Sequence, residues 1–495
     1  MSDPSITPPG REWGAHRYRH RLQLRWILLP AVVLASVGIW LAVRPHPWRP
    51  PSGSPAFAHC SLEGGLSAWC GHVAVPEDPD DPHGAQIFLR VAVLRATTRP
   101  ADGALFFLEG GPGGPATEAA ADVSSILGEV ERHRDLVFVD QRGTGGSVPL
   151  ACPDEHVRAA DASAVTAYLR RCFAHLGGRP ELSTTAVAAD DLDAVRRALG
   201  YGRIDLVGAS YGATLAQAML RQHPDAVRTA VLDGASLPGV HVYEAEARNA
   251  EHALDAVLAR CAAQPACRRA DPSPRRDLTK LLARAPRHVT TETGEVVLSA
   301  DDVASTIASL SETTAGAATI PYVLHAAAHG DYTPLGRAYT AGLGADLDAR
   351  ARLAMVWVVL CSEPWAASDP AATATAARGS YLAASAVARA RLFAQACRVV
   401  PRGRVAEGSG AAVPTDVPVL LLAGSADPLD PPANLRGWRR AFPDGRLVVV
   451  PGAAHGVLDE GCVPSIVDRF VARGSARGLD LSCASKVQLP ALQVG

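Results

Sequence analysis

Three residues far apart in the sequence, Ser210, Asp427 and His455, have the types and the chain order needed for covalent acyl transfer. Ser210 stands in the stretch Gly208-Ala209-Ser210-Tyr211-Gly212, which matches the G-x-S-x-G pattern of a nucleophile on a sharp strand-to-helix turn. Glycines flank such a serine because the turn leaves no room for neighbouring Cβ atoms. In this chemistry a neutral histidine accepts the serine proton, while the carboxylate holds the imidazole in one tautomer.

Each candidate follows an apolar stretch with strand character: Ile204 to Val207, Val417 to Leu422 and Arg446 to Val450. A helical pattern follows the serine, over residues 213–222. Polar groups at the carboxyl ends of parallel strands gather at one edge of an open sheet. The order serine, aspartate, histidine is that of α/β-hydrolases and not of the other two large serine-hydrolase designs. We therefore predict an α/β-hydrolase fold, with a mostly parallel central sheet flanked by helices.

The acid has an alternative in the same loop. Asp430 follows Asp427 closely and could instead cap a helix that begins near Pro431. We favour Asp427 as the catalytic acid because it lies nearer the end of the preceding strand.

A second glycine cluster follows the apolar strand pattern from Leu105 to Leu108. The loop Glu109-Gly110-Gly111-Pro112-Gly113-Gly114-Pro115 is too rich in glycine and proline for a strand or a helix, so it exposes backbone N–H groups. In this fold one oxyanion donor is the amide after the nucleophile and the other comes from the loop after the third strand. We expect the amides of Tyr211 and Gly111 to take these roles. The alternative is a plain flexible turn.

A further strand pattern, Leu136 to Val139, runs into Asp140-Gln141-Arg142-Gly143-Thr144-Gly145-Gly146-Ser147. The Gly-Gly-Pro-Gly loop followed by an Asp-Gln-Arg-Gly-x-Gly-x-Ser segment resembles the prolyl aminopeptidase family of α/β-hydrolases, and particularly its larger secreted tripeptidyl-aminopeptidase-like branch. The likeness runs from about Cys60 to Cys483.

The resemblance implies a Ser210, Asp427 and His455 triad and an oxyanion hole lined by Gly111 and Tyr211. It also implies that Asp140 and Arg142 brace the loop beside the hole. One position departs from the pattern: Glu109 stands where many prolyl aminopeptidases carry histidine. The role of Glu109 and the substrate preference are therefore left open.

The N-terminus predicts a membrane segment. Residues 26–43 are apolar apart from Pro30 and Ser36, and they follow a basic stretch with arginines at positions 11, 17, 19, 21 and 25. The positive-inside bias places residues 1–25 in the cytoplasm and the catalytic body outside. We predict an uncleaved signal anchor at 26–43, followed by a Pro-rich linker at 44–58. The alternative is secretion after cleavage of a signal peptide near the A-x-A-like sequence Ala56-Phe57-Ala58.

Ten cysteines fall as local pairs along the chain, and none has zinc-ligand spacing. Sequence alone does not fix their connectivity, but disulfides suit an extracytoplasmic compartment. The family resemblance implies nearest-neighbour pairing: Cys60 with Cys70, Cys152 with Cys172, Cys261 with Cys267, Cys361 with Cys397, and Cys462 with Cys483. The alternative is a set of reduced, buried thiols.

A long insertion that is rich in alanine and has helical spacing separates two parts of the predicted hydrolase core, 59–238 and 414–495. Within residues 239–413, four Ala-rich stretches have helical spacing: 244–260, 301–310, 345–359 and 371–396. We predict a helical cap over the catalytic edge of the sheet. A pocket for a substrate amine needs carboxylates that face it. Glu363, Glu244 and Glu246 are the candidates, with Glu363 preferred because Cys361 tethers its segment; the alternative is ordinary helix-surface glutamates.

The composition suits a large catalytic body, since 48% of the 495 residues are hydrophobic. With 48 Lys and Arg against 50 Asp and Glu and no basic stripe beyond the N-terminus, we expect no nucleic-acid partner, and no internal repeat is evident. The expected function is an extracytoplasmic serine aminopeptidase that acts on peptides without cofactor or metal. The alternatives are a carboxylesterase with the same triad and a non-catalytic binding protein, which would have no reason to keep the triad.

Overall fold

The computed structural model describes residues 57–494, except for 99, 154, 156, 158–160, 292–293 and 343–352. The predicted cytoplasmic segment 1–25, the predicted anchor 26–43 and nearly all of the linker 44–58 lie outside these residues. In the part of the chain that is described, no helix has both the length and the apolar character needed to cross a membrane.

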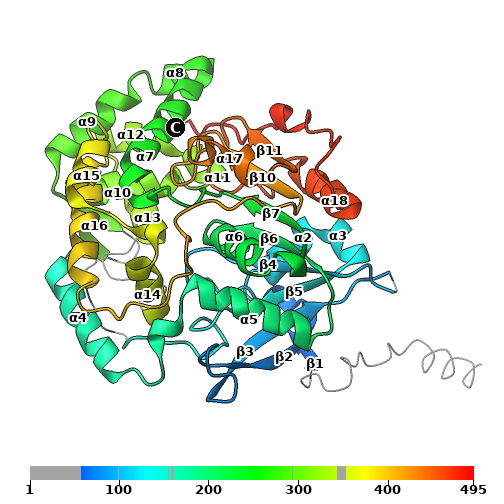
Figure 1. Cartoon of the computed structure of the whole chain (residues 1–495). Coiled ribbons are helices and arrows are strands. Elements are labelled where there is room, and N and C mark those ends of the chain that lie inside the picture. Colours follow the sequence, from blue (N-terminus) through cyan, green and yellow to red (C-terminus); the bar gives the residue numbers. More distant parts are fainter. Residues whose placement is uncertain are drawn as a thin grey trace, which may run out of the picture. The chain divides into compact units, whose positions relative to one another are not determined.

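The described strands build a nine-stranded sheet in the order β1-β2-β3-β5-β4-β6-β7-β10-β11 (Figure 1). The first four strands of this order pair antiparallel, and every pairing from β5 to β11 is parallel. The strands are β1 Phe57–Ser61, β2 Ser67–Pro76, β3 Gln86–Leu94, β4 Ala104–Leu108, β5 Asp135–Val139, β6 Ile204–Ala209, β7 Val227–Asp233, β10 Val419–Gly424 and β11 Gly445–Val450. This confirms the predicted mostly parallel sheet.

The central parallel strands are buried along their whole length, as sheets covered on both faces require. On one face, side chains of β4, β5, β10 and β11 join those of α2 (Ala120–Ile126), α3 (Gly128–His133) and α18 (Val463–Arg473) in one apolar core. Helices α5 (Thr185–Ala198) and α6 (Tyr211–Gln222) pack together over the other face (Figure 1). The sheet is therefore a rigid platform for the loops at its edge.

A helical insertion lies between β7 and β10, as predicted. In Figure 1 most of its helices lie to the left of the sheet. The elements are α7 Val242–Ala263, α8 Pro265–Ala270, α9 Pro274–Arg284, β8 Arg287–Thr291, β9 Gly294–Leu298, α10 Ala300–Leu310, α11 Thr314–Ala317, α12 Ile320–Ala328, α13 Thr333–Gly342, α14 Ala354–Ser362, α15 Pro370–Ala376 and α16 Ala383–Ala396.

Two details of the insertion differ from the sequence analysis. The stretch 371–396 forms two helices instead of one, because the backbone turns at Gly379, which has a φ of 84°. The insertion also contains the antiparallel hairpin β8–β9, which lies outside the four predicted helical stretches and was not predicted. Of the predicted helix 345–359, residues 345–352 lie outside the described range, Leu353 is extended and forms an isolated bridge with Ala151, and the part from Ala354 belongs to α14.

Five disulfides join the cysteines in the nearest-neighbour pairs, and no described cysteine is free. The bridge between Cys361 and Cys397 closes 36 residues and connects the end of α14 to the end of α16. The other bridges close between 6 and 21 residues. The insertion is thus fastened internally at two places, by Cys261–Cys267 and by Cys361–Cys397.

Candidate active site

Ser210 occupies the sharp turn between β6 and α6, with a φ of 54° that non-glycine residues rarely adopt. The glycines around it are required by space. A Cβ on Gly208 would lie 2.3 Å from the carbonyl oxygen of Gly212, and one on Gly212 would lie 1.9 Å from that of Leu108. The turn is held to β7 by a 2.8 Å hydrogen bond from the Ser210 amide to the Asp233 carbonyl oxygen.

His455 and Asp427 meet through a 2.9 Å hydrogen bond between the imidazole Nδ1 and the carboxylate Oδ2. Oδ1 of Asp427 accepts two further hydrogen bonds of 2.8 Å, from the backbone amides of Leu429 and Asp430. The carboxylate is buried, and hydrogen bonds to both of its oxygens fix its orientation. Because Nδ1 donates to Asp427, the lone pair of neutral His455 is on Nε2, which is buried and has no hydrogen-bond partner among the described residues.

The segment Asp233–Gly234, at the end of β7, borders both the serine and the histidine. The carbonyl oxygen of Asp233 accepts a hydrogen bond from the Ser210 amide. A Cβ on Gly234 would lie only 2.8 Å from Cε1 of His455. The side chain of Asp233 accepts hydrogen bonds from the amides of Val457 and Leu458, just beyond the histidine. One strand end therefore positions the serine turn and the histidine loop together.

Asp430 lies in the same loop as Asp427 but has different contacts. Its carboxylate accepts a hydrogen bond from the Ser236 hydroxyl, which in turn accepts one from Asn434 at 2.8 Å. Burial raises the pKa of Asp430 to about 6. The short helix Pro432–Leu435 that follows has no side-chain cap, so the alternative role for Asp430 as a helix cap is not observed.

Several carboxylates surround the imidazole of His455. Burial of the ring lowers its pKa, but the charges of Asp427, Asp430 and Asp233 and the hydrogen bond to Asp427 outweigh this effect and raise it above its ordinary value. A charged imidazole is therefore well stabilised at this place, which is what a general base needs once it has accepted a proton.

The glycine-rich loop after β4 comes close to the serine. A Cβ on Gly110 would lie 3.0 Å from the Cβ of Ser210, and Gly111, with a φ of 114°, lines the same cavity as Ser210 and Tyr211. The amide of Gly110 is not available as an oxyanion donor, because it donates a 2.9 Å hydrogen bond to the carboxylate of Glu109. Glu109, whose role the sequence left open, thus holds the loop in its turn.

The Asp140–Ser147 segment braces this region. Asp140 accepts hydrogen bonds from the amides of Thr117 and Gly146, each at 2.9 Å. Arg142 forms two 2.6 Å hydrogen bonds to the carboxylate of Asp191 in α5, and its guanidinium also donates to the carbonyl oxygen of Pro76. This arrangement fits the bracing role that the family resemblance implied.

Next to Ser210 the structure has a cavity of about 280 Å³ that is lined by both the core and the insertion. Acidic side chains outnumber basic ones in its lining. The four acidic and two basic residues are Glu246, Glu312, Glu363, Asp430, Arg221 and Arg389. Aromatic residues, Tyr211, Tyr243 and Trp365, form an apolar part of the wall.

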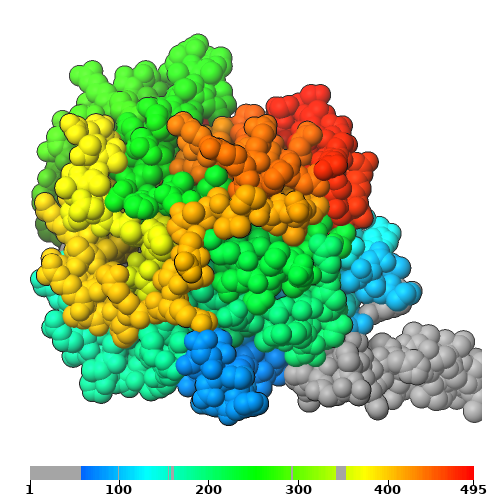
Figure 2. All heavy atoms as spheres, viewed as in Figure 1, coloured from blue at the N-terminus to red at the C-terminus, as the bar shows by residue number. Residues whose placement is uncertain are grey.

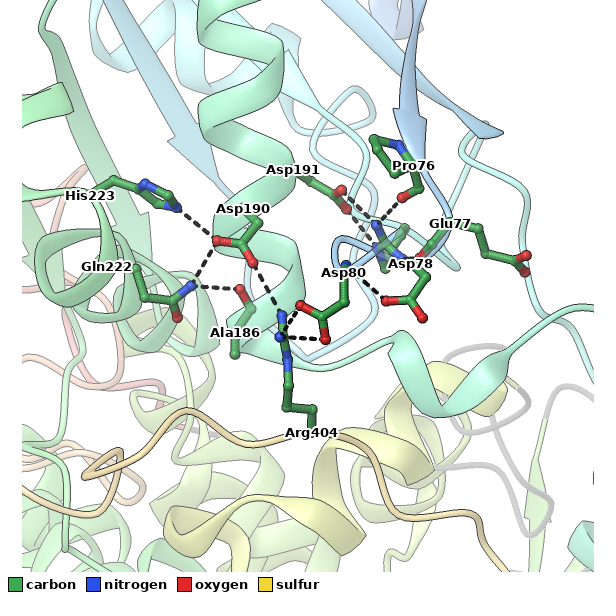
Figure 3. Close-up of polar contacts among 11 residues, drawn as sticks. Pro76, Glu77, Asp78, Asp80, Ala186, Asp190, Asp191, Gln222, His223 and Arg404 are labelled. Atoms are coloured by element: carbon green, nitrogen blue, oxygen red, sulfur yellow. Dashed lines mark hydrogen bonds and ion pairs between the residues drawn. The ribbon is translucent and has the colours of Figure 1, made fainter. Parts of the chain in front are cut away.

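Another part of the wall, Val405, Ala406 and Ser409, comes from the segment between α16 and β10. Figure 2 shows this golden segment on the surface between the yellow helices of the insertion and the green helices of the core. Arg404 fastens it through hydrogen bonds to Asp80, at 2.9 and 3.1 Å, and an ion pair with Asp190 (Figure 3).

The three predicted amine-binding glutamates have different surroundings. Glu363 lines the cavity, but both of its carboxylate oxygens already accept hydrogen bonds, from the Thr185 amide at 2.8 Å and from Trp365 Nε1 at 2.7 Å. Burial raises its pKa. Glu244 is not among the residues that line the cavity: its carboxylate accepts a hydrogen bond from the Asp369 amide instead.

Glu246 is buried and lines the cavity. Its Oε1 accepts a 2.8 Å hydrogen bond from Arg389, whereas its Oε2 has no partner among the described residues. Glu312, which the sequence analysis missed, also lines the cavity, and burial raises its pKa. The backbone carbonyl of Glu312 accepts a 3.1 Å hydrogen bond from the amide of His455, so this residue joins the insertion to the histidine loop.

Comparison with known proteins gives a family match and partial matches to curated proteins. The family model described as alpha/beta hydrolase fold matches residues 103–461. The chain is 35% identical over 192 residues to a tripeptidyl aminopeptidase of Streptomyces lividans, covering 34% of this chain and 35% of that protein. It is 33% identical over 284 residues to the serine protease Hip1 of Mycobacterium tuberculosis, covering 50% and 53%.

A third relative is named for a different activity. Over 224 residues the chain is 30% identical to carboxylesterase B of Mycobacterium tuberculosis, covering 41% of this chain and 43% of that protein. The matches thus span from about a third to about half of the length of these relatives. The family model covers more than half of the chain and includes Ser210, Asp427 and His455. The chain belongs to the alpha/beta hydrolase fold family.

Proposed function

We propose that the protein is a serine hydrolase that releases short peptides or single residues from the N-terminus of peptides through an acyl-enzyme on Ser210. Neutral His455 takes the hydroxyl proton through Nε2 as Ser210 attacks the scissile carbonyl carbon. Asp427 keeps the imidazole in the right tautomer and stabilises its charged form. The amides of Gly111 and Tyr211 donate to the oxyanion. His455 then passes the proton to the leaving amine, and water, activated by the same histidine, releases the product.

The observation that carries the peptidase proposal is the unpaired carboxylate oxygen of Glu246 in the acidic cavity beside Ser210. Arg389 pairs with one oxygen of Glu246, and Glu312 supplies a second carboxyl group in the same cavity that can accept hydrogen bonds from a substrate cation. A protonated N-terminal amine is costly to bury unless carboxylates receive it. We therefore place Glu246 ahead of Glu363 as the amine-binding residue, because each oxygen of Glu363 already accepts one hydrogen bond whereas Oε2 of Glu246 accepts none.

The disulfides support an oxidising, extracytoplasmic location for the catalytic part. We propose that residues 26–43 anchor this part to the membrane, with residues 1–25 in the cytoplasm. Peptides outside the cytoplasm are then the substrates.

A test compares the same peptide with a free and an acetylated N-terminus. We expect acetylation to lower kcat/KM by about a hundredfold or more, because it leaves a buried carboxylate unpaired at a cost of about 3 kcal/mol. Glu246→Gln should reduce the cleavage of free-amine peptides and leave small-ester hydrolysis close to normal. Glu244→Gln is the matched control, since this residue lies on the same helix away from the cavity.

The second candidate is a carboxylesterase, which the partial likeness to carboxylesterase B favours. It needs the same triad and oxyanion hole but has no use for amine-binding carboxylates. Equal rates on free and acetylated peptides, together with much faster ester cleavage, would select the esterase and reject the peptidase.

A further inference from the structure

A cluster of potential metal ligands lies in the insertion, among residues that the proposed chemistry does not use. One ligand atom from each of Asp277, His325 and His329 lies within 4.8 Å of the others. The two histidines are four residues apart at the end of α12, so they share one face, and their ring centroids are 4.1 Å apart. Asp277 comes from the first turn of α9, which packs against α12.

A second observation points to a missing cation at this cluster. The buried carboxylate of Asp271 has no hydrogen-bond partner for either oxygen among the described residues. Its Oδ1 lies 3.7 Å from Nδ1 of His325; this nitrogen atom is buried and has no hydrogen-bond partner among the described residues, although the His325 side chain is 35% exposed. Buried polar atoms without partners are rare in folded proteins and call for an explanation such as an ion.

The tautomer of His329 and the free oxygen of Asp277 also suit metal binding. Nδ1 of His329 lies 2.8 Å from the carbonyl oxygen of His325 and can only donate to it, so the lone pair of the neutral ring is on Nε2. The His329 side chain is exposed, which gives a metal ion access from solvent. Asp277 is nearly buried, and Lys280 donates to its Oδ1 at 2.9 Å, which leaves Oδ2 for a metal.

We propose that Asp277, His325 and His329 form a zinc(II) site with the Asp271 carboxylate beside it. Two imidazoles and carboxylate oxygens match the ligands that zinc prefers, whereas calcium and magnesium prefer oxygen alone. Asp271, whose contact in the group is with Nδ1 of His325, acts as the carboxylate that orients this imidazole, an arrangement common around zinc. The sequence predicted no metal, because the cysteines lack zinc-ligand spacing and the approach of Asp277 to the two histidines is a contact between separate helices.

The site has a structural role. None of its residues lines the cavity beside Ser210. A bound ion ties α9 to α12, whose apolar side chains Leu278, Leu281, Val323 and Leu324 already share one core. Zinc bound by the folded insertion and not by the unfolded chain stabilises the fold by mass action.

The test uses the untagged full chain in mild detergent, stripped with a chelator and then titrated with zinc chloride. We expect one zinc per chain and a rise in Tm that saturates with zinc concentration. Calcium and magnesium at the same concentration should leave Tm unchanged. Cobalt(II) should give the visible absorption of a tetrahedral nitrogen- and oxygen-ligated site.

Variants assign the ligands. His329→Ala should abolish the Tm rise and the cobalt spectrum, while its Tm in chelator equals that of the wild type. His175→Ala is the matched control, because His175 is also exposed and makes the same type of hydrogen bond to the carbonyl four residues before it. Asp271→Asn should weaken zinc binding by about 10- to 100-fold. Lys280→Ala should tighten it, because a competing positive charge is removed.

Two results would overturn the proposal. One is the absence of saturable binding of a single zinc to the wild-type chain. The other is zinc binding that His329→Ala and His175→Ala leave equally intact. Both results are independent of peptidase activity, so they do not affect the proposed function.

Discussion

At the scale of single residues, the contacts of Asp427 and Asp430 separate their roles. Asp427 bonds directly to the imidazole of His455, whereas Asp430 bonds to Ser236. Asp427→Asn should lower kcat/KM by about a thousandfold or more, because an amide no longer selects the tautomer with its lone pair on Nε2. Asp430→Asn should cost less than about tenfold. If steady-state kinetics show Asp430→Asn to be the more damaging change, the acid has been assigned wrongly.

The carboxylates around His455 also predict the pH dependence. Burial alone would lower the pKa of the imidazole, but Asp427, Asp430 and Asp233 together raise it. Only the neutral ring can accept the serine proton, so kcat/KM should rise with pH through a pKa above the ordinary value of about 6.5. Asp430→Asn removes one charge that favours the protonated ring, and this rising limb should move to lower pH. A shift to higher pH would contradict this electrostatic account.

At the scale of elements, the Cys361–Cys397 bridge ties α14, and with it the Glu363 segment, to α16. Replacing both cysteines with alanine should cost about 3 to 4 kcal/mol of stability, since the bridge closes 36 residues in the unfolded chain. Opening the Cys261–Cys267 bridge, which closes only 6 residues, should cost about 2 kcal/mol. Urea unfolding checks this order. Equal losses, or a larger loss from the shorter loop, would refute the loop-closure argument.

The elements that position the serine could be predicted because their causes are local. Gly208 and Gly212 are required by contacts within one turn, and the strands ending before Asp427 and His455 are short apolar runs. Helix α7 gives an example in which local spacing alone narrows the choice between two candidate residues. Glu244 and Glu246 are two residues apart, so a helix cannot turn both toward one cavity. The spacing excluded one of them, but only the packing of α7 against its neighbours decides that Glu246 is the one inside.

At the scale of the whole molecule, the contacts that the sequence could not predict are those between the insertion and the core. Glu312 lies in a turn before α11, and nothing in its local pattern marks it as part of the site. It reaches the cavity because its carbonyl binds the amide of His455, more than a hundred residues later in the chain. The proposed zinc site lies within the insertion, but the same difficulty applies to it: the spacing of His325 and His329 is visible in the sequence, whereas the approach of Asp271 and Asp277 is not.

Covalent labelling shows whether Ser210 is the nucleophile. A fluorophosphonate probe is incubated with the full chain, and the modified peptide is identified by mass spectrometry while peptide cleavage is followed in parallel. We expect one adduct per chain, on the peptide that carries Ser210, with cleavage lost in proportion to labelling. Ser210→Ala should keep the wild-type Tm yet neither label nor cleave. An adduct on another serine, or a Ser210→Ala variant that still labels and cleaves, would contradict the account.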